Sequence, residues 1–156
     1  MMKANQRKLL IMLAIVFWMA IIFKLSAQPG EQSNLLSGKV TNLFVSLVHV
    51  VDADANVLTL NYFIRKCAHF VAYLVLGIIS LFAARRVGYD GRKGLGIAFG
   101  ICVSYAIADE IHQAFVPGRT PKLLDVLIDS SGGAMGTELY LLFIEDYWKK
   151  FAQKYM

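Results

Sequence analysis

Residues Asp109–Asp129, D-E-I-H-Q-A-F-V-P-G-R-T-P-K-L-L-D-V-L-I-D, decide how the rest of the chain is arranged. This stretch places four carboxylates, a histidine, a glutamine and an arginine between two strongly apolar segments. Ionisable groups at such a position are costly unless they pair or face water, so they indicate a functional site. Pro117-Gly118 interrupts the stretch and predicts two helices joined by a tight turn.

The composition indicates a membrane protein. The 156 residues fit a single domain, residues 1–156, and are 57% hydrophobic but only 17% charged. The net charge of +5 does not indicate a nucleic-acid partner, because the basic residues lie at the ends of apolar runs, where they set topology. Cys67 and Cys102 lie inside apolar segments and are predicted to be buried free thiols rather than a disulfide.

Four apolar segments are predicted to cross the membrane as helices, at about residues 9–25, 67–84, 94–112 and 123–144. For the first segment a secretory signal peptide is the alternative, since Ser26-Ala27 offers a cleavage site. Under both interpretations the residues after 26 face outward. The predicted fold class is therefore an all-α integral membrane protein with four transmembrane helices.

A further helix is expected between the first two spans. From Leu36 to Val51, apolar residues recur at helical spacing, while polar residues fall mostly on other faces. The segment is too polar to be a span. It predicts an amphipathic helix on the outer membrane surface or against the bundle.

Lysine and arginine predict the orientation. The N-terminus carries three of these residues, the loop at residues 85–93 four and the C-terminus three, together ten of the sixteen in the chain. Four spans place all three regions on one side, which the positive-inside rule makes cytoplasmic. Both termini are then cytoplasmic, and the charged motifs of residues 26–66 and 109–122 meet on the extracytoplasmic face of the bacterial membrane.

Small residues predict where the spans approach one another. Gly96, Gly100, Ser104 and Ala108 recur every four residues in the third span, and Gly132 and Gly136 do so in the fourth. Such ladders let another helix approach closely. If the two ladders face each other, His112 is carried toward Asp125 and Asp129.

Arg65, His69 and Tyr73 fall on one helical face at the predicted outer end of the second span, next to Lys66. Two cations on this side run against the positive-inside trend, so a nearby group is expected to neutralise them. One interpretation is pairing with Asp125, Asp129 or Glu110, which would hold the bundle together. The other is an anion site for a phosphate or a carboxylate.

Asp109 lies one helical turn before His112 and Gln113. A carboxylate at this spacing can orient a histidine for proton transfer; a hydrogen-bonded cap that closes the bundle is the alternative. The Pro117-Gly118 turn is expected to aim Arg119 back over the membrane surface, where its planar guanidinium suits a carboxylate or a phosphate.

Asp125 and Asp129 lie one turn apart at the predicted outer start of the fourth span. Two close carboxylates share a proton, bind a cation or pair with basic residues. A metal site formed by His69, His112 and these carboxylates is one alternative, but the chain has no His-Glu-x-x-His or Cys-x-x-Cys spacing to support it, so no metal is expected. No phosphate loop, nucleophile elbow or dinucleotide motif appears, so no cofactor is expected either.

Four pieces of the chain resemble the VanZ-like family of small bacterial membrane proteins. They are F-K-L-S-A-Q-P-G-E-Q-S (Phe23–Ser33), R-K-C-A-H-F-V-A-Y (Arg65–Tyr73), D-E-I-H-Q-A-F-V-P-G-R (Asp109–Arg119) and D-V-L-I-D-S-S-G-G-A-M-G (Asp125–Gly136). The resemblance implies a link to glycopeptide-resistance gene clusters and low-level teicoplanin resistance. One departure is Thr120-Pro121-Lys122, where the family pattern has a small Gly-Ser-like step.

The expected function is that of a cell-envelope membrane protein that binds an anionic amphiphile at the outer leaflet. That partner is a membrane lipid or a lipid-linked envelope component. The alternatives are an intramembrane hydrolase or transferase acting on such a lipid and a structural bundle whose charges only pair. The expected acid/base residues are His112, Asp109, Glu110 and His69, and the expected ligand-binding residues are Arg65, Lys66, Tyr73, Gln113, Arg119, Asp125 and Asp129.

Overall fold

The computed structural model describes residues 4–29, 33, 35, 37–40, 43 and 57–145, and within this part of the chain the regular structure is entirely helical. Four long elements are α-helices: α1 (Ala4–Ser26), α3 (Val57–Val87), α4 (Gly91–Gln113) and α5 (Leu123–Leu139). The last continues into a π-helix, η1 (Tyr140–Glu145). The predicted amphipathic helix at Leu36–Val51 lies largely outside the described residues.

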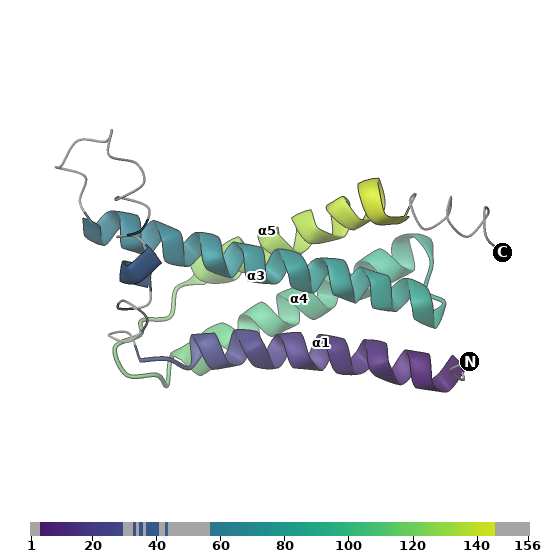
Figure 1. Ribbon diagram of the computed structural model, residues 1–156, viewed down its shortest axis with the longest axis horizontal. Coiled ribbons are helices and arrows are strands. Elements are labelled where there is room, and N and C mark those ends of the chain that lie inside the picture. The colour runs from purple at the N-terminus through teal and green to yellow at the C-terminus, as the bar shows by residue number, and fades with distance from the viewer. Residues whose placement is uncertain are drawn as a thin grey trace.

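The long helices run side by side as a bundle (Figure 1). α3 packs along α5, α4 packs against both, and α1 lies against α3 and α4. The start of α1, the turn at residues 88–90 and η1 lie at one end of the bundle, here called the basic end. The end of α1, the start of α3 and the turn at residues 114–122 lie at the other end, here called the polar end.

Among the described residues, three helices are long and apolar enough to cross a membrane, and they contain the first three predicted spans. Their apolar segments are Asn5–Ser26, Thr59–Val87 and Gly91–Gln113. The predicted fourth span coincides with α5 and η1, but α5 has only 17 residues. As an α-helix it is about 25 Å long, shorter than the roughly 30 Å hydrocarbon core, so the fourth span stays a prediction.

α3 is much longer than the predicted span at residues 67–84. It has 31 residues, which makes it about 46 Å long. Its early start follows from Leu60, Phe63 and Ile64, which continue the apolar residues at helical spacing. Because α3 exceeds the thickness of a hydrocarbon core, its first turns extend beyond the other helices at the polar end (Figure 1).

The two small-residue ladders differ in their packing. A Cβ at Gly132 or Gly136 would collide with the carbonyl oxygens of Phe70 or Leu74, so α5 lies in close contact with α3. Gly96 and Gly100 have open space beside them and are exposed, as are Ser104 and Ala108.

The two ladders therefore do not face each other, and the predicted close approach of another helix is found at the ladder of α5 but not at that of α4. The opposite face of α4 is the one that packs, and it brings Cys102 against Gly133 of α5. This face also holds Ala98, Ala106, Asp109 and Gln113, all of them buried.

The core lies between α1, α3 and α4 and contains Ile22, Tyr73, Leu76, Cys102 and Ala106. Two hydrogen bonds fix α1 on this core: Trp18 donates to the carbonyl of Ala72, and Tyr105 donates to that of Met19. Both cysteines are free thiols, as predicted, but only Cys102 is buried. Cys67 is exposed, because it lies on the face of α3 that no described helix covers.

Candidate functional site

Charged residues from α3, α4 and α5 form two layers at the polar end. The outermost, here called the paired layer, consists of Lys66, Glu110, Lys122 and Asp125. The ammonium of Lys66 forms an ion pair with Asp125, and the carboxylate of Glu110 accepts a hydrogen bond from the backbone N–H of Lys122. Lys66 and Lys122 also lie over the ring of Tyr62. Glu110 accepts a hydrogen bond, whereas Asp125 Oδ1 has the ion pair with Lys66 and no hydrogen bond among the described residues. These contacts join the three helices.

The second layer lies one helical turn further into the bundle and consists of His69, Asp109 and Asp129, here called the His–Asp cluster. One side-chain nitrogen or oxygen from each residue lies within 4.8 Å of those of the other two. His69 Nδ1 is 3.5 Å from Asp129 Oδ2. Asp109 and Asp129 are only 3% and 2% exposed, so the two carboxylates are almost completely withdrawn from solvent.

Asp109 is held in place by two hydrogen bonds to the same oxygen. Its Oδ2 accepts from the hydroxyl of Ser26 on α1 at 2.8 Å and from the side-chain amide of Gln113 at 3.0 Å. Ser26 is fully buried and Gln113 nearly so. Residues of two helices, α1 and α4, therefore fix the carboxylate of Asp109 through Oδ2, and neither of them bonds its other oxygen, Oδ1.

Several polar atoms around the cluster have no partner among the described residues. They are Asp109 Oδ1, Asp129 Oδ1 and the hydroxyl of Tyr73. Tyr73 is 0% exposed and lies one helical turn after His69 on α3. Buried polar atoms without partners are uncommon in folded proteins, because each costs the full price of desolvation.

His112 lies apart from this cluster. Its ring packs on Phe23 of α1, with 4.3 Å between the ring centroids. Asp109 accepts its hydrogen bonds from Ser26 and Gln113 instead. The structure therefore shows no orientation of His112 by Asp109. The difference arises because the buried face of α4 carries positions 106, 109, 110 and 113, and position 112 is rotated toward α1.

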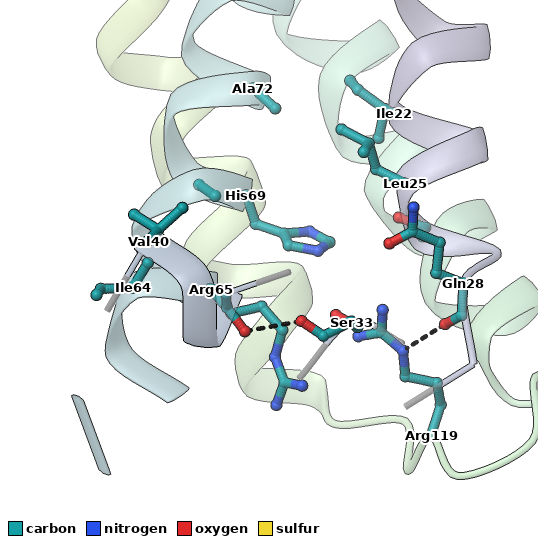
Figure 2. A pocket seen from close by; sticks show the side chains of 13 residues that line it. Ile22, Leu25, Gln28, Ser33, Val40, Ile64, Arg65, His69, Ala72 and Arg119 are labelled. Carbon is teal, nitrogen blue, oxygen red and sulfur yellow. Dashed lines mark hydrogen bonds between the residues drawn. The ribbon is translucent and has the colours of Figure 1, made fainter. Parts of the chain in front are cut away.

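A cavity of about 350 Å³ opens beside the cluster, between α1, α3 and the turn at residues 114–122. Its wall is mainly apolar and includes Ile22, Leu25, Ile64 and Ala72. Figure 2 shows the imidazole of His69 pointing into this space, so that one side chain belongs to both the cavity and the cluster. Ser26 lines the cavity as well.

Two arginines, Arg65 and Arg119, also line the cavity. Arg119 is brought there by the predicted tight turn, in which Gly118 adopts a φ of 72° that suits glycine. Its Nε donates to the carbonyl of Gln28 at 3.2 Å (Figure 2). Burial, and then the neighbouring guanidinium of Arg65, lower the pKa of Arg119. Two arginines thus line one mainly apolar cavity.

The predicted site residues are divided among these features. Arg65, Arg119 and His69 line the cavity; Asp109, Asp129, Gln113 and Tyr73 surround the cluster; Lys66, Glu110 and Asp125 belong to the paired layer; His112 packs on α1.

Residues not predicted from the sequence also contribute, chiefly Ser26, Gln28 and Ser33. In the sequence they lie in the polar segment that begins where the first apolar run ends. The position of this segment, at the predicted outer end of a span, is the feature that could have indicated them.

Comparison with known proteins gives one match. The model of a family described as VanZ/LLP1 matches residues 11–144, which is most of the chain. Neither the curated proteins nor the solved structures contain a match.

Proposed function

The chain belongs to the VanZ/LLP1 family, and on this premise we propose that it is a cell-envelope membrane protein that binds an anionic amphiphile in its cavity. The ligand classes that fit are a lipid-linked wall precursor, a phospholipid and a lipoglycopeptide of the teicoplanin kind. Each combines a charged phosphate or carboxylate with an apolar chain. Teicoplanin resistance itself is a property that the family name carries, and for this member it is part of the proposal.

The observation that carries the proposal is the joint lining of one apolar cavity by Arg65 and Arg119. Like charges brought together in a weakly polar setting repel each other, and an anion between them relieves that repulsion. A guanidinium also offers two parallel donors to a phosphate or carboxylate. The apolar wall beyond the arginines would then cover the first part of an acyl or prenyl chain.

The proposed topology makes this cavity accessible from the outer leaflet. α5 and η1 together would complete a fourth crossing, with the π-helical turn allowing the segment to reach the basic end. Ten of the sixteen lysines and arginines lie in the N-terminal, 85–93 and C-terminal regions. The positive-inside rule then assigns both termini to the cytoplasm and the polar end to the extracytoplasmic side.

An enzymatic function is the second candidate, because His69 is part of both the cavity and the His–Asp cluster. A histidine next to a buried carboxylate is a suitable general base for activating water or a hydroxyl. A phosphate held by the arginines would lie near that base. The reaction class would be hydrolysis or group transfer on a lipid phosphate.

The test is native mass spectrometry of the protein purified in mild detergent, which detects a retained lipid directly. The unaltered protein should carry an anionic lipid, and Arg65→Ala/Arg119→Ala should lose it. Arg92→Ala is the matched control, since Arg92 is an exposed arginine at the basic end, far from the cavity. Retention of the same lipid by the double variant would contradict the proposal.

The enzymatic candidate is tested separately by incubating the protein with a pyrophosphate-linked lipid and measuring released phosphate. Release that is lost in His69→Gln would favour catalysis. A lipid that is bound but stays intact would favour binding alone. Cysteine labelling at positions 90 and 120 tests the topology, with position 120 expected outside and position 90 inside.

A further inference from the structure

Three residues from three different helices converge beside the cavity, which one of them, His69, also lines, and we infer that they form a binding site for a divalent cation of the Zn²⁺ type. The residues are His69 of α3, Asp109 of α4 and Asp129 of α5. This inference does not depend on the anionic ligand, because a bound ion can be measured on the protein without any lipid.

The distances suit a metal ion. Ligand atoms about 2.1 Å from a tetrahedral ion lie about 3.4 Å from one another. His69 Nδ1 and Asp129 Oδ2 are already 3.5 Å apart, and all three candidate ligand atoms lie within 4.8 Å of one another. Small side-chain rotations would therefore bring the three protein ligands to coordinating distance with no movement of the helices, and a water would be the fourth ligand.

The charge of the site also favours a cation. Two carboxylates, 3% and 2% exposed, lie next to one imidazole in a region with little access to water. Buried ionised groups are costly without a compensating charge. Lys66, the nearest lysine along α3, is paired with Asp125 in the other layer. A divalent ion would neutralise both carboxylates at once.

The unpartnered atoms give independent support. The hydroxyl of Tyr73, on a side chain that is 0% exposed and one helical turn after His69, lacks a hydrogen-bond partner in the described part of the chain. Asp109 Oδ1 and Asp129 Oδ1 are unpartnered in the same region. A metal ion would engage the carboxylate oxygens, and a water bound to the ion would give the tyrosine its partner.

The surroundings resemble those of protein metal sites in one further respect. Carboxylates that bind metals are usually oriented by hydrogen bonds from outside the coordination shell. Ser26 and Gln113 do this for Asp109, since both donate to its Oδ2. One nitrogen and two oxygens as donors favour Zn²⁺ over Ca²⁺ or Mg²⁺, which prefer six or more oxygen ligands.

The experiment uses the full chain, purified without a histidine tag, stripped with a chelator and titrated with ZnCl2 by calorimetry. We expect one Zn²⁺ per chain, with MgCl2 and CaCl2 unable to compete. His69→Gln and Asp129→Asn should weaken binding more than about 100-fold, and Tyr73→Phe about 10-fold, as for a residue outside the coordination shell. Asp90→Asn, an exposed carboxylate at the basic end, and Cys67→Ser, an exposed thiol, serve as controls that should bind normally.

Two results would overturn the inference. One is a stripped protein that takes up no Zn²⁺, and the other is full affinity retained in both His69→Gln and Asp129→Asn. If these variants fail to fold, the unaltered protein decides the question through the visible absorption of bound Co²⁺. Bands of a four- or five-coordinate ion support the site, and the spectrum of hydrated Co²⁺ alone refutes it.

Discussion

The paired layer and the His–Asp cluster are built from similar residues but differ in the hydrogen-bond and ion-pair partners of those residues. Each layer takes one carboxylate from α4 and one from α5, and the two α4 residues, Glu110 and Asp109, are neighbours in sequence. In the paired layer a lysine and a backbone N–H match the carboxylates. In the cluster one oxygen of each aspartate and the hydroxyl of Tyr73 have no described partner.

This difference separates a structural role from a functional one. An ion pair in which an ammonium donates and a carboxylate accepts joins two helices, and removing one of its partners destabilises the protein. A buried group without a partner lowers stability, and such groups persist mainly where function needs them. Both layers lie in the most charged region of the bundle, yet only the cluster opens on the cavity through His69.

The largest effect is expected where both layers are disturbed together. Gly132→Leu places a side chain against the carbonyl of Phe70, next to His69, and forces α5 away from α3. Overpacking at a helix contact costs about 3 kcal/mol, and both ligand retention and stability should fall. Unfolding in a detergent series with increasing SDS, followed by circular dichroism, measures the loss.

Gly100→Leu is the matched control for that substitution. Gly100 lies in the exposed ladder of α4, with open space around it. Its replacement should change stability by less than about 0.5 kcal/mol, as expected for a substitution that touches no packed feature. A large loss at Gly100 would mean that a second chain covers this face in the membrane.

The second largest effect is expected on function, with little change in stability. Asp129→Asn keeps the shape of the side chain but removes a charge that lacks full compensation. We expect lipid retention to fall about 100-fold, whereas the free energy of unfolding should change by less than about 1 kcal/mol. Native mass spectrometry and SDS unfolding of the same variant measure these two quantities.

The matched variant for Asp129→Asn is Asp125→Asn, one turn earlier on the same helix. In Asp125→Asn the larger effect should be on stability, because the ion pair with Lys66 is lost. The free energy of unfolding should fall clearly, whereas lipid retention should change little. Equal phenotypes for the two variants would contradict the division into layers.

Loss of the lysine in the paired layer should have a smaller effect. Lys66→Met leaves the carboxylate of Asp125 without its ion pair, at 14% side-chain exposure. Partial exposure and the positive end of the α5 dipole soften the penalty, so we expect about 2 kcal/mol of destabilisation. Combining it with Asp125→Leu should restore part of that loss, because the unpaired charge is removed; no recovery in SDS unfolding would show that Lys66 contributes by packing.

The helices and the gathering of charge at one end follow from the sequence for a simple reason. Apolar runs of membrane length and the Pro117-Gly118 turn are local signals, and the order of these segments brings their polar ends together. The family was recognisable from four motifs spread along the chain. The start of α3 was missed, because Arg65 and Lys66 obscure the apolar spacing that precedes them.

The assignment of partners did not follow from the sequence, because it depends on the rotation of each helix. Successive residues are about 100° apart around a helix, so Asp109 and Glu110 enter different layers although they are adjacent. A four-residue spacing of small residues does not reveal whether they face another helix. The ladder of α5 packs against α3, whereas that of α4 is exposed. All three residues of the His–Asp cluster were predicted as site residues, but their grouping with one another was not, because they come from three helices and no spacing motif joins them.

The smallest effect is expected at His112, which the sequence places among the acid/base residues and the structure places against α1. His112→Ala removes a ring contact with Phe23, worth about 1 kcal/mol. Because His112 lies outside the cavity lining and the cluster, ligand retention should be nearly unchanged, and His112→Phe should recover the lost stability. The measurement is native mass spectrometry beside SDS unfolding. If both variants fold as stably as the parent and still lose the ligand, His112 acts in the site and the cluster as defined here is incomplete.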